Sequence, residues 1–295
     1  MKIKILIPVY NDYQSVSKLL FHINSTISNT DDEFSVLIIN DSSSEKSEID
    51  VSKLDKIKSI KIINMIENRG HARCIAAGLK YIYEKEEFDY VIPMDGDGED
   101  RPEEIVKFTE FFKYDFIKPI VGERIKRSEG LIFKISYIIH KLITFIFTGN
   151  LIKFGNFTCL PRSTVEKMIN EKSTWSSFSG SLAKLEKNRS TIPSVRGERY
   201  FGPSKMSFYN LIKHSLSIIA VFKTNVIIRS ILFFLIYIFL ISKNITYITS
   251  IPLIAVIGLV ISVLAISKRE NINELNDSLS NIENVEEIKS NKKGK

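Results

Sequence analysis

The chain is poor in the residues on which disulfide and zinc scaffolds depend. Its 295 residues include only 2 cysteines, 4 histidines and 1 tryptophan. Cys74 and Cys159 lie far apart and lack the spacing of zinc ligands, so we expect two buried thiols in a reducing compartment. A disulfide framework or a zinc module is therefore not the basis of the fold.

The chain also lacks the signals of a nucleic-acid partner and of a cleavable leader. It carries 41 Lys and Arg against 34 Asp and Glu, a formal net charge of +7, yet it has no RNA- or DNA-binding motif and no dense basic stripe. Its basic residues collect near apolar segments, which favours an anionic membrane surface. The apolar run Ile3–Val9 is short, contains Lys4 and Pro8, and precedes no small-residue cleavage site, so we expect the first strand of a cytosolic domain.

Residues 1–125 alternate short apolar runs with amphipathic stretches, a pattern that predicts a parallel sheet covered by helices on both faces. The expected strands are Lys2–Pro8, Phe34–Asn40, Ile60–Met65, Phe88–Met94 and Ile117–Gly122, and the expected helices are Tyr13–Ser28, Arg69–Lys85 and Pro102–Tyr114. Ligands of such sheets bind beyond the carboxyl ends of the strands. The polar clusters that should converge there are Asn11-Asp12, Asp41-Ser42 and Asp95-Gly96-Asp97.

The most informative stretch is residues 94–104, M-D-G-D-G-E-D-R-P-E-E. Asp95 and Asp97 flank Gly96 directly after an apolar run, so the pattern predicts two carboxylates on a tight turn at the end of a buried strand. Mg²⁺ takes oxygen ligands from one or two carboxylates and the others from water and substrate phosphates. The turn therefore suits a metal–diphosphate complex, and the alternative is a solvated acidic loop.

Residues 126–222 contain two apolar segments that carry Lys and His. Leu131–Phe147 has too many apolar positions for a simple two-sided helix. It is either a pair of core helices or, as we favour, a helix that lies in the membrane interface over about 130–150. Ser207–Phe222 is a second candidate, and we assign 206–225 to a juxtamembrane amphipathic helix.

Two long apolar runs near the end of the chain predict a membrane hairpin, with a soluble core as the alternative. Val226–Ile241 is nearly all apolar apart from Arg229 and one serine, whereas Ile245–Ile266 carries no charge and reaches the roughly 20 residues that a span requires. We assign 226–267 to two transmembrane helices, whose basic flanks place both ends in the cytoplasm. The charged remainder, 268–295, is expected to be a partly helical or disordered cytoplasmic tail.

Six motifs occur in an order that resembles a known family. They are I-P-V-Y-N-D at 7–12, I-N-D-S-S-S at 39–44, E-N-R-G-H-A-R-C-I-A-A-G-L at 67–79, the acidic stretch, V-G-E-R-I-K-R at 121–127 and R-Y-F-G-P-S-K at 199–205. Together they resemble the family 2 glycosyltransferases of GT-A fold, and the hairpin is similar to that of dolichol-phosphate mannose synthases and bacterial polyprenyl-phosphate glycosyltransferases. The resemblance implies an α/β catalytic domain over residues 1–205 with a Rossmann-like, mostly parallel sheet, followed by interfacial helices and the hairpin.

The resemblance also implies a donor site for a nucleotide-diphosphate sugar. The donor-binding residues would be Pro8, Tyr10, Asp12, Asp41, Arg69, Asp95 and Gly96. Asp12 also suits the N-cap of the following helix, Asp41 suits a turn, and Arg69 or Arg73 suits a surface salt bridge. Asn40 stands where the family more often has Asp.

The same resemblance implies a divalent metal, Mg²⁺ or Mn²⁺, and a set of phosphate contacts. The metal ligands would be Asp95, Asp97 and Glu99, the catalytic residues Asp97, Arg124, Arg127 and Asn156, and the phosphate- or lipid-binding residues Arg199, Ser204 and Lys205. Glu99 stands at the family's usual Gln. For the last three residues, the alternative is a general basic cluster at the membrane surface.

Asn156 bears on the acceptor, because many relatives carry Asp at this position. An amide cannot act as the general base that a sugar hydroxyl needs, whereas a phosphate monoester, with a second pKa of about 6, is already largely ionised at pH 7. We therefore expect inverting transfer from a UDP- or GDP-linked sugar to a polyprenyl phosphate at the cytoplasmic membrane. The alternatives are transfer to a saccharide or glycolipid hydroxyl and a non-catalytic protein that binds nucleotide sugars; a homo-oligomer stays open.

Overall fold

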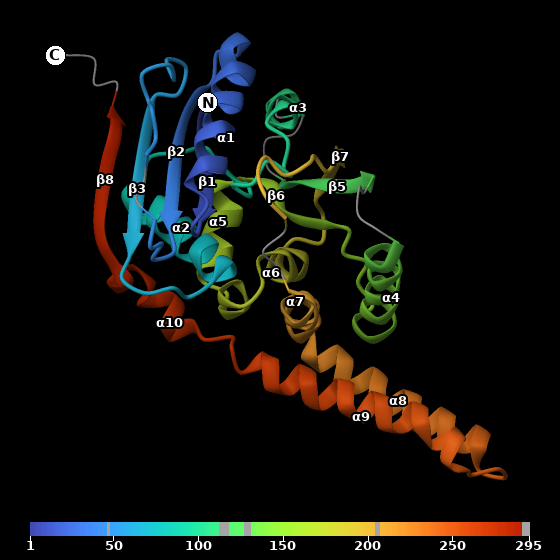
Figure 1. Ribbon diagram of the computed structural model, residues 1–295. Coiled ribbons are helices and arrows are strands. Elements are labelled where there is room, and N and C mark those ends of the chain that lie inside the picture. The colour runs from blue at the N-terminus through green and yellow to red at the C-terminus, as the bar shows by residue number, and fades with distance from the viewer. Residues whose placement is uncertain (46–47, 112–117, 127–130, 204–206, 291–295) are drawn as a thin grey trace.

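The computed structural model describes residues 1–45, 48–111, 118–126, 131–203 and 207–290. In these ranges eight strands form one sheet in the order β7-β5-β6-β4-β1-β2-β3-β8 (Figure 1). Its parallel centre contains β1 (Lys2–Val9), β2 (Glu33–Asn40), β3 (Ser59–Met65) and β4 (Tyr90–Pro93). The expected α/β architecture with a mostly parallel centre is confirmed.

The central strands are apolar on both faces because helices cover both. On β1, Ile5 and Ile7 pack into the cluster that contains α1 (Tyr13–Thr26) and α3 (Glu103–Phe111), while Leu6 packs into the cluster that contains α2. All three side chains are fully buried. The remaining helical elements on the sheet are η1 (Ile27–Asn29), α2 (His71–Lys85), α5 (Arg162–Ile169), η2 (Lys172–Trp175) and α6 (Phe178–Leu185).

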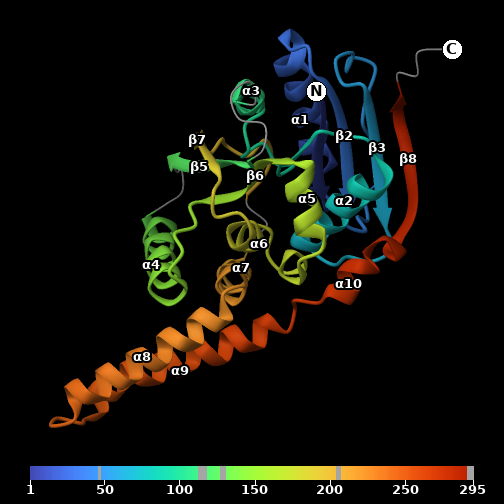
Figure 2. The same cartoon turned by 180° about the vertical axis from the view of Figure 1, so that it is seen from behind.

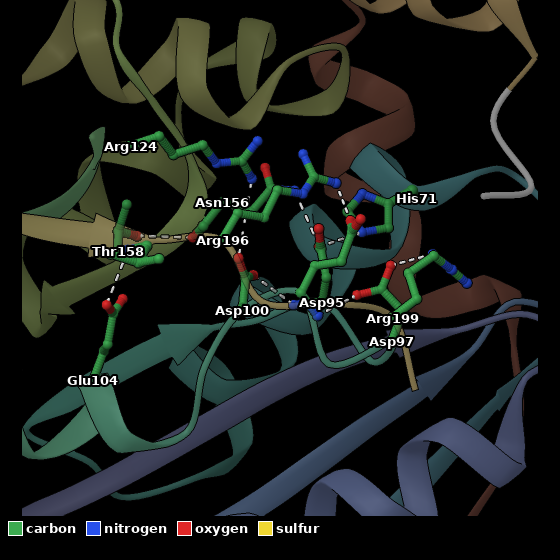
Figure 3. Close-up of polar contacts among 12 residues, drawn as sticks. His71, Asp95, Asp97, Asp100, Glu104, Arg124, Asn156, Thr158, Arg196 and Arg199 are labelled. Atoms are coloured by element: carbon green, nitrogen blue, oxygen red, sulfur yellow. Dashed lines mark hydrogen bonds and ion pairs between the residues drawn. The ribbon is translucent and has the colours of Figure 1, made fainter. Parts of the chain in front are cut away.

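Beyond β4 the sheet becomes mixed. β6 (Phe154–Pro161) runs antiparallel to both β4 and β5 (Ile120–Lys126), and β7 (Ser190–Val195) runs parallel to β5. The sequence pattern of residues 1–125 predicts β1 to β5 but not this change of direction. Its consequence is that β5, β6 and the segment after β7 all approach the loop that follows β4 (Figure 3).

Two long helices extend away from the sheet domain as a hairpin (Figures 1 and 2). They are α8 (Lys223–Ile241) and α9 (Tyr247–Ser267), and only 11% of the most apolar window of each candidate span is buried. Large apolar side chains such as Phe239 and Ile248 are each 78% exposed, so these helices are not the core of a soluble domain. They are two candidate membrane spans, and α4 (Leu131–Thr148) and α7 (Phe208–Ala220) lie near the base of the hairpin.

The tail after the hairpin corrects one expectation. It folds into α10 (Ile272–Asn276), η3 (Ser278–Asn281) and β8 (Ile282–Ser290), and β8 pairs antiparallel with β3. The prediction of a tail that is only helical or disordered is therefore wrong for β8. The many charged side chains of β8 obscure the alternating pattern by which a strand is predicted. This strand covers the edge of β3, where unpaired backbone groups would otherwise remain. Both ends of the hairpin thus return to the same domain.

Candidate active site

The acidic turn after β4 is shaped by its own carboxylates. The backbone N–H of Asp95 donates to Asp100 Oδ2 at 2.9 Å, and the N–H of Glu99 donates to Asp97 Oδ1 at 2.9 Å. Gly98 has φ +90°, a conformation that L side chains rarely adopt. The turn therefore presents several carboxylates within a few residues at the carboxyl end of a central strand.

The segment after β7 lies along this turn and brings two arginines to it (Figure 3). Its backbone is fixed by Gly197 N–H donating to Glu99 O at 2.8 Å and by Tyr200 N–H donating to Asp97 O at 2.9 Å. Arg196 forms an ion pair with the Glu99 side chain, and Arg199 forms one with Asp97.

Arg199 also reaches the first loop of the domain, because its Nη2 lies 3.3 Å from Asp12 Oδ2. Asp12 is the N-cap residue of α1, but its side chain makes no capping hydrogen bond. The carboxylates after β1 and β4 therefore share one guanidinium, so two of the predicted polar clusters do converge.

Asp95 is approached from two further elements. His71 Nε2, from the first residue of α2, lies 3.0 Å from Asp95 Oδ1, and Asn156 on β6 donates to the same oxygen at 3.4 Å. Arg124 Nη2, from β5, lies 4.0 Å from Asp100 Oδ1. Figure 3 shows these side chains pointing toward the acidic turn from different elements.

The clustered carboxyl groups differ in acidity. Burial opposes ionisation of Asp95, but the charge and hydrogen bond of His71 outweigh it and hold the pKa of Asp95 below its ordinary value. Burial and then the charge of Asp95 raise the pKa of Asp97 to about 6 and that of Asp100 to about 7. A cation placed among these carboxyl groups would favour the ionised forms of Asp97 and Asp100, so the cluster is suited to bind a positive charge.

Asp95 and Asp97 fit a divalent cation that also binds a diphosphate. Within the described ranges, no three Asp, Glu, His or Cys side chains gather closely enough to hold a metal ion by themselves. Glu99 is not brought into such a group, since its carboxylate pairs with Arg196. Two crowded, half-buried carboxylates are a donor set that Mg²⁺ or Mn²⁺ accepts when water and phosphate oxygens complete its shell.

The loops after β1 and β2 are tied together beside this turn. Asn11 N–H donates to Ser43 Oγ at 2.9 Å, and Asn11 Oδ1 accepts from Ser44 N–H at 2.8 Å. Asp41 accepts the backbone N–H groups of Arg69 and Gly70, both at 2.9 Å. Asp41 thus stabilises the turn that precedes α2, as expected of a turn-forming aspartate. Its contact with the nucleotide base stays a prediction.

The remaining predicted residues fall into three groups. Pro8 and Gly96 lie side by side, since a Cβ on Gly96 would lie 3.4 Å from Pro8 O, and Tyr10, two residues after Pro8 in the chain, is 49% exposed. Arg69 pairs with Glu67, and its contact with the donor stays a prediction. Arg127, Ser204 and Lys205 lie outside the described residues.

Two site residues were missed by sequence reasoning, His71 and Arg196. His71 lies inside the third motif, at the start of α2, which begins at the carboxyl edge of the sheet, and this placement is the signal that identifies it. Arg196 has no local signal, because its partner Glu99 is 97 positions away.

The comparisons with known proteins agree with this geometry. The model of the family described as glycosyl transferase family 2 matches residues 4–173. The chain belongs to glycosyl transferase family 2. It is therefore a glycosyltransferase, and its sheet domain has the GT-A fold.

Two relatives carry the same name. The undecaprenyl-phosphate 4-deoxy-4-formamido-L-arabinose transferase of Klebsiella pneumoniae (strain 342) is 29% identical over 222 residues, which cover 72% of this chain and 64% of that protein. Its counterpart from Salmonella choleraesuis (strain SC-B67) is 30% identical over 221 residues, with the same coverage of 72% and 64%. The chain thus matches less than two thirds of the length of these relatives.

A solved structure shows the likeness in fold. The glucosyl-3-phosphoglycerate synthase of Mycobacterium tuberculosis, in complex with Mn²⁺, uridine-diphosphate and glucosyl-3-phosphoglycerate, superposes with a TM-score of 0.55 at 11% identity, covering 76% of this chain and 79% of that one. At this identity the likeness concerns the fold alone.

Proposed function

We propose that this glycosyltransferase moves a sugar, with inversion, from a nucleotide-diphosphate sugar to the phosphate of a polyprenyl phosphate at the cytoplasmic face of a membrane. The observation that carries the proposal is the position of the acidic turn and its arginines. They lie at the carboxyl edge of the parallel strands, the edge that faces α6, α7 and the base of the hairpin (Figures 1 and 2). The names of the two curated relatives support a polyprenyl phosphate as the acceptor.

In the proposed reaction, an ionised phosphate oxygen of the acceptor attacks the anomeric carbon of the sugar. The new bond joins that oxygen to the carbon, and the bond from the carbon to the diphosphate breaks. The leaving group departs with the electron pair as a nucleoside diphosphate. No proton has to be removed from the acceptor, which is consistent with Asn156 at a position where a general base is common in relatives.

The chain's own residues would stabilise the charge that develops on the diphosphate. Arg199 and Arg124 reach the acidic turn from opposite sides and present guanidinium groups, which suit phosphate oxygens. Asp95 and Asp97 would hold Mg²⁺ or Mn²⁺, whose positive charge stabilises a leaving diphosphate. Fixed charges aimed at the leaving group act most strongly in a site that water enters poorly.

The membrane-facing side of the domain supports a lipid acceptor. α4 exposes Ile138, Leu142 and Phe145, which are 59%, 57% and 52% exposed, and α7 exposes Tyr209 at 72%. We propose that these helices lie in the interface while α8 and α9 span the bilayer. Because β8 pairs with β3 in the same domain, both chain ends would be cytoplasmic.

The test is transfer of radiolabel by the full chain in detergent or vesicles. A panel of UDP- and GDP-linked sugars, with Mg²⁺ or Mn²⁺, is offered undecaprenyl phosphate in one arm and saccharides in the other. We expect label in the organic phase from at least one donor, dependent on undecaprenyl phosphate and abolished by EDTA. Label found only in the saccharide arm would contradict a lipid phosphate acceptor and would support a hydroxyl acceptor instead.

The second candidate, transfer to a saccharide or glycolipid hydroxyl, draws on Asp100. Burial and the charge of Asp95 raise the pKa of this carboxyl to about 7, a value that suits a general base near neutral pH. Asp100 is only 5% exposed, and one of its oxygens accepts from the backbone of Asp95. Its engagement in shaping the turn makes the phosphate acceptor the better-supported candidate.

A further inference from the structure

A row of asparagine side chains crosses three strands, from the tail to a loop of the site. Asn64 on β3 donates through Nδ2 to Asn284 Oδ1 and to Glu286 Oε1 on β8, both at 2.7 Å. Asn40 at the end of β2 donates to Asn64 Oδ1 at 2.8 Å. The amide row therefore runs from β8, through β3, to the last residue of β2.

The row ends on a strained turn. Asn40 Oδ1 accepts from Ser43 N–H at 2.9 Å, and between them Ser42 has φ +58°, which is uncommon for a residue other than glycine. Such a conformation is unfavourable for a serine and persists only where surrounding contacts enforce it. Here the enforcing contact is made by the Asn40 side chain, whose orientation is set by Asn64.

The strained turn in turn holds the first loop. Ser43 Oγ accepts from Asn11 N–H, and Asn11 itself has φ +50°. Asn11 is followed by Asp12, which pairs with Arg199. Hydrogen bonds, together with the covalent link between Asn11 and Asp12, thus connect β8 with the loops after β1 and β2, which are assigned to the nucleotide.

We propose that the tail strand β8 positions the nucleotide-binding loops, with Asn64 as the positioning residue that transmits its effect through Asn40. The proposal rests on the proposed function in one respect, the assignment of the loops after β1 and β2 to the nucleotide of the donor. It explains Asn40, where the family more often has Asp. The amide of Asn40 donates to Asn64 and accepts from Ser43, whereas an ionised aspartate in its place could only accept.

The amide groups of the row all donate in one direction, from Asn40 to Asn64 and from Asn64 to Asn284, and the test uses this direction. In Asn64→Asp, one carboxylate oxygen still accepts from Asn40, while the other faces the carboxylate of Glu286 and repels it. Adding Glu286→Lys converts that repulsion into an ion pair. The measurements are the dissociation constants of UDP and GDP with Mn²⁺, by calorimetry on the full chain in detergent, and the KM and kcat of transfer.

We expect Asn64→Asp to weaken binding of the preferred nucleotide, and to raise KM for its sugar, about fivefold or more, with kcat within about twofold. The added Glu286→Lys should restore both values to within about twofold. Asn284→Ala removes one exposed partner and should weaken binding in the same direction. Glu283→Gln on the same strand is the matched control and should leave binding unchanged.

Unchanged nucleotide affinity in both Asn64→Asp and Asn284→Ala would overturn the proposal, and so would a loss in kcat without a loss in affinity. If Asn64→Asp is too unstable to measure, the exposed Asn284→Ala decides the matter alone. If the variants show the expected nucleotide affinities but the wild-type chain transfers no sugar to a lipid phosphate, the proposed acceptor is overturned and this inference stands.

Discussion

At the scale of single residues, the site depends on contacts between positions far apart in the chain. Gly98 is an example, because it has φ +90° and a Cβ placed there would lie 2.6 Å from the Tyr200 ring. Tyr200 is fixed in turn by His22, whose Nδ1 lies 2.8 Å from its hydroxyl. The absence of a side chain at Gly98 therefore lets the arginine-bearing segment lie against the acidic turn.

Gly98→Ala should accordingly lower the free energy of unfolding by about 1–3 kcal/mol and reduce transfer, since the turn or the Tyr200 ring must shift. Thermal unfolding and transfer rate measure the two effects. Gly258→Ala is the control, because a Cβ at Gly258 meets nothing within 4 Å. Equal stability and activity in the two variants would contradict this account of the turn.

A second residue-scale prediction concerns acid stability. Burial raises the pKa of Glu86, but hydrogen bonds from Lys4 and Lys61 outweigh it, so its pKa lies below the ordinary 4.5. A depressed folded pKa contributes stability that is present above about pH 4.5 and is lost as the pH falls through the folded value. Glu86 is only 13% exposed, so this contribution is not one of a surface pair.

Glu86→Gln should therefore destabilise the protein at neutral pH by about 1–2 kcal/mol, and the difference from wild type should shrink below pH 4 or so. Denaturant unfolding between pH 3 and 7 measures this. Glu87→Gln, whose parent side chain is 85% exposed beside Lys2, should cost little. A Glu86 effect that grows in acid would have the wrong sign for this explanation.

The sequence was a good guide to which residues enter the site and a poor guide to their partners. Asp95, Asp97 and Asp12 were predicted to converge because each follows a strand of one parallel sheet. The pairing of Glu99 with Arg196 could not be predicted, since it depends on the path of the segment after β7. Asn40 was read as a departure from the family, and only the position of Asn64 gives it a physical reason.

At the scale of elements, α4 is held to the hairpin by its last carbonyl groups. Arg229 on α8 donates to Ile146 O at 2.8 Å and to Phe145 O at 3.4 Å, and Asn225 donates to Thr148 O at 2.9 Å. These carbonyls belong to the last turn of α4, where helix carbonyls run out of intrahelical N–H partners, and Phe145 O also accepts from the N–H of Gly149 at 2.9 Å. The charge inside an otherwise apolar run is thus explained by the helix that it caps.

Arg229→Leu should loosen the end of α4, because hydrogen bonds from a charged group are lost. The free energy of local opening there should fall by about 1–2 kcal/mol. Hydrogen exchange of the backbone amides of residues 145–150, in detergent, reports the loosening directly. Lys243→Leu, at the exposed far end of the hairpin, is the control. Unchanged exchange in Arg229→Leu would show that apolar packing alone holds α4.

At the scale of the whole molecule, the tail joins the hairpin of candidate membrane spans to the outer edge of the sheet. Glu274 in α10 accepts from Trp175 Nε1 at 2.6 Å, and its carboxylate lies 3.3 Å from Arg73 in α2. β8 follows and pairs along β3. The parallel sheet and the hairpin could be predicted from apolar runs, but β8 could not, because an edge strand exposed to water carries charges and lacks such a run.

Removal of residues 272–295 should therefore expose the edge of β3, lower the melting temperature by several degrees and promote aggregation. Size-exclusion chromatography and thermal unfolding measure these effects. Removal of residues 291–295 alone is the control and should leave both unchanged. A monomeric, equally stable protein without 272–295 would mean that β8 adds nothing to the fold.

The most direct test of the whole account is label transfer to undecaprenyl phosphate in vesicles by wild type, Asp97→Asn and the control Asp31→Asn. The account predicts transfer by wild type and Asp31→Asn, and a rate about 10²–10³-fold lower in Asp97→Asn, with the melting temperature unchanged or raised because the raised pKa of Asp97 means that folding already disfavours its charge. Near-normal transfer by Asp97→Asn would contradict the placement of the reaction at the acidic turn.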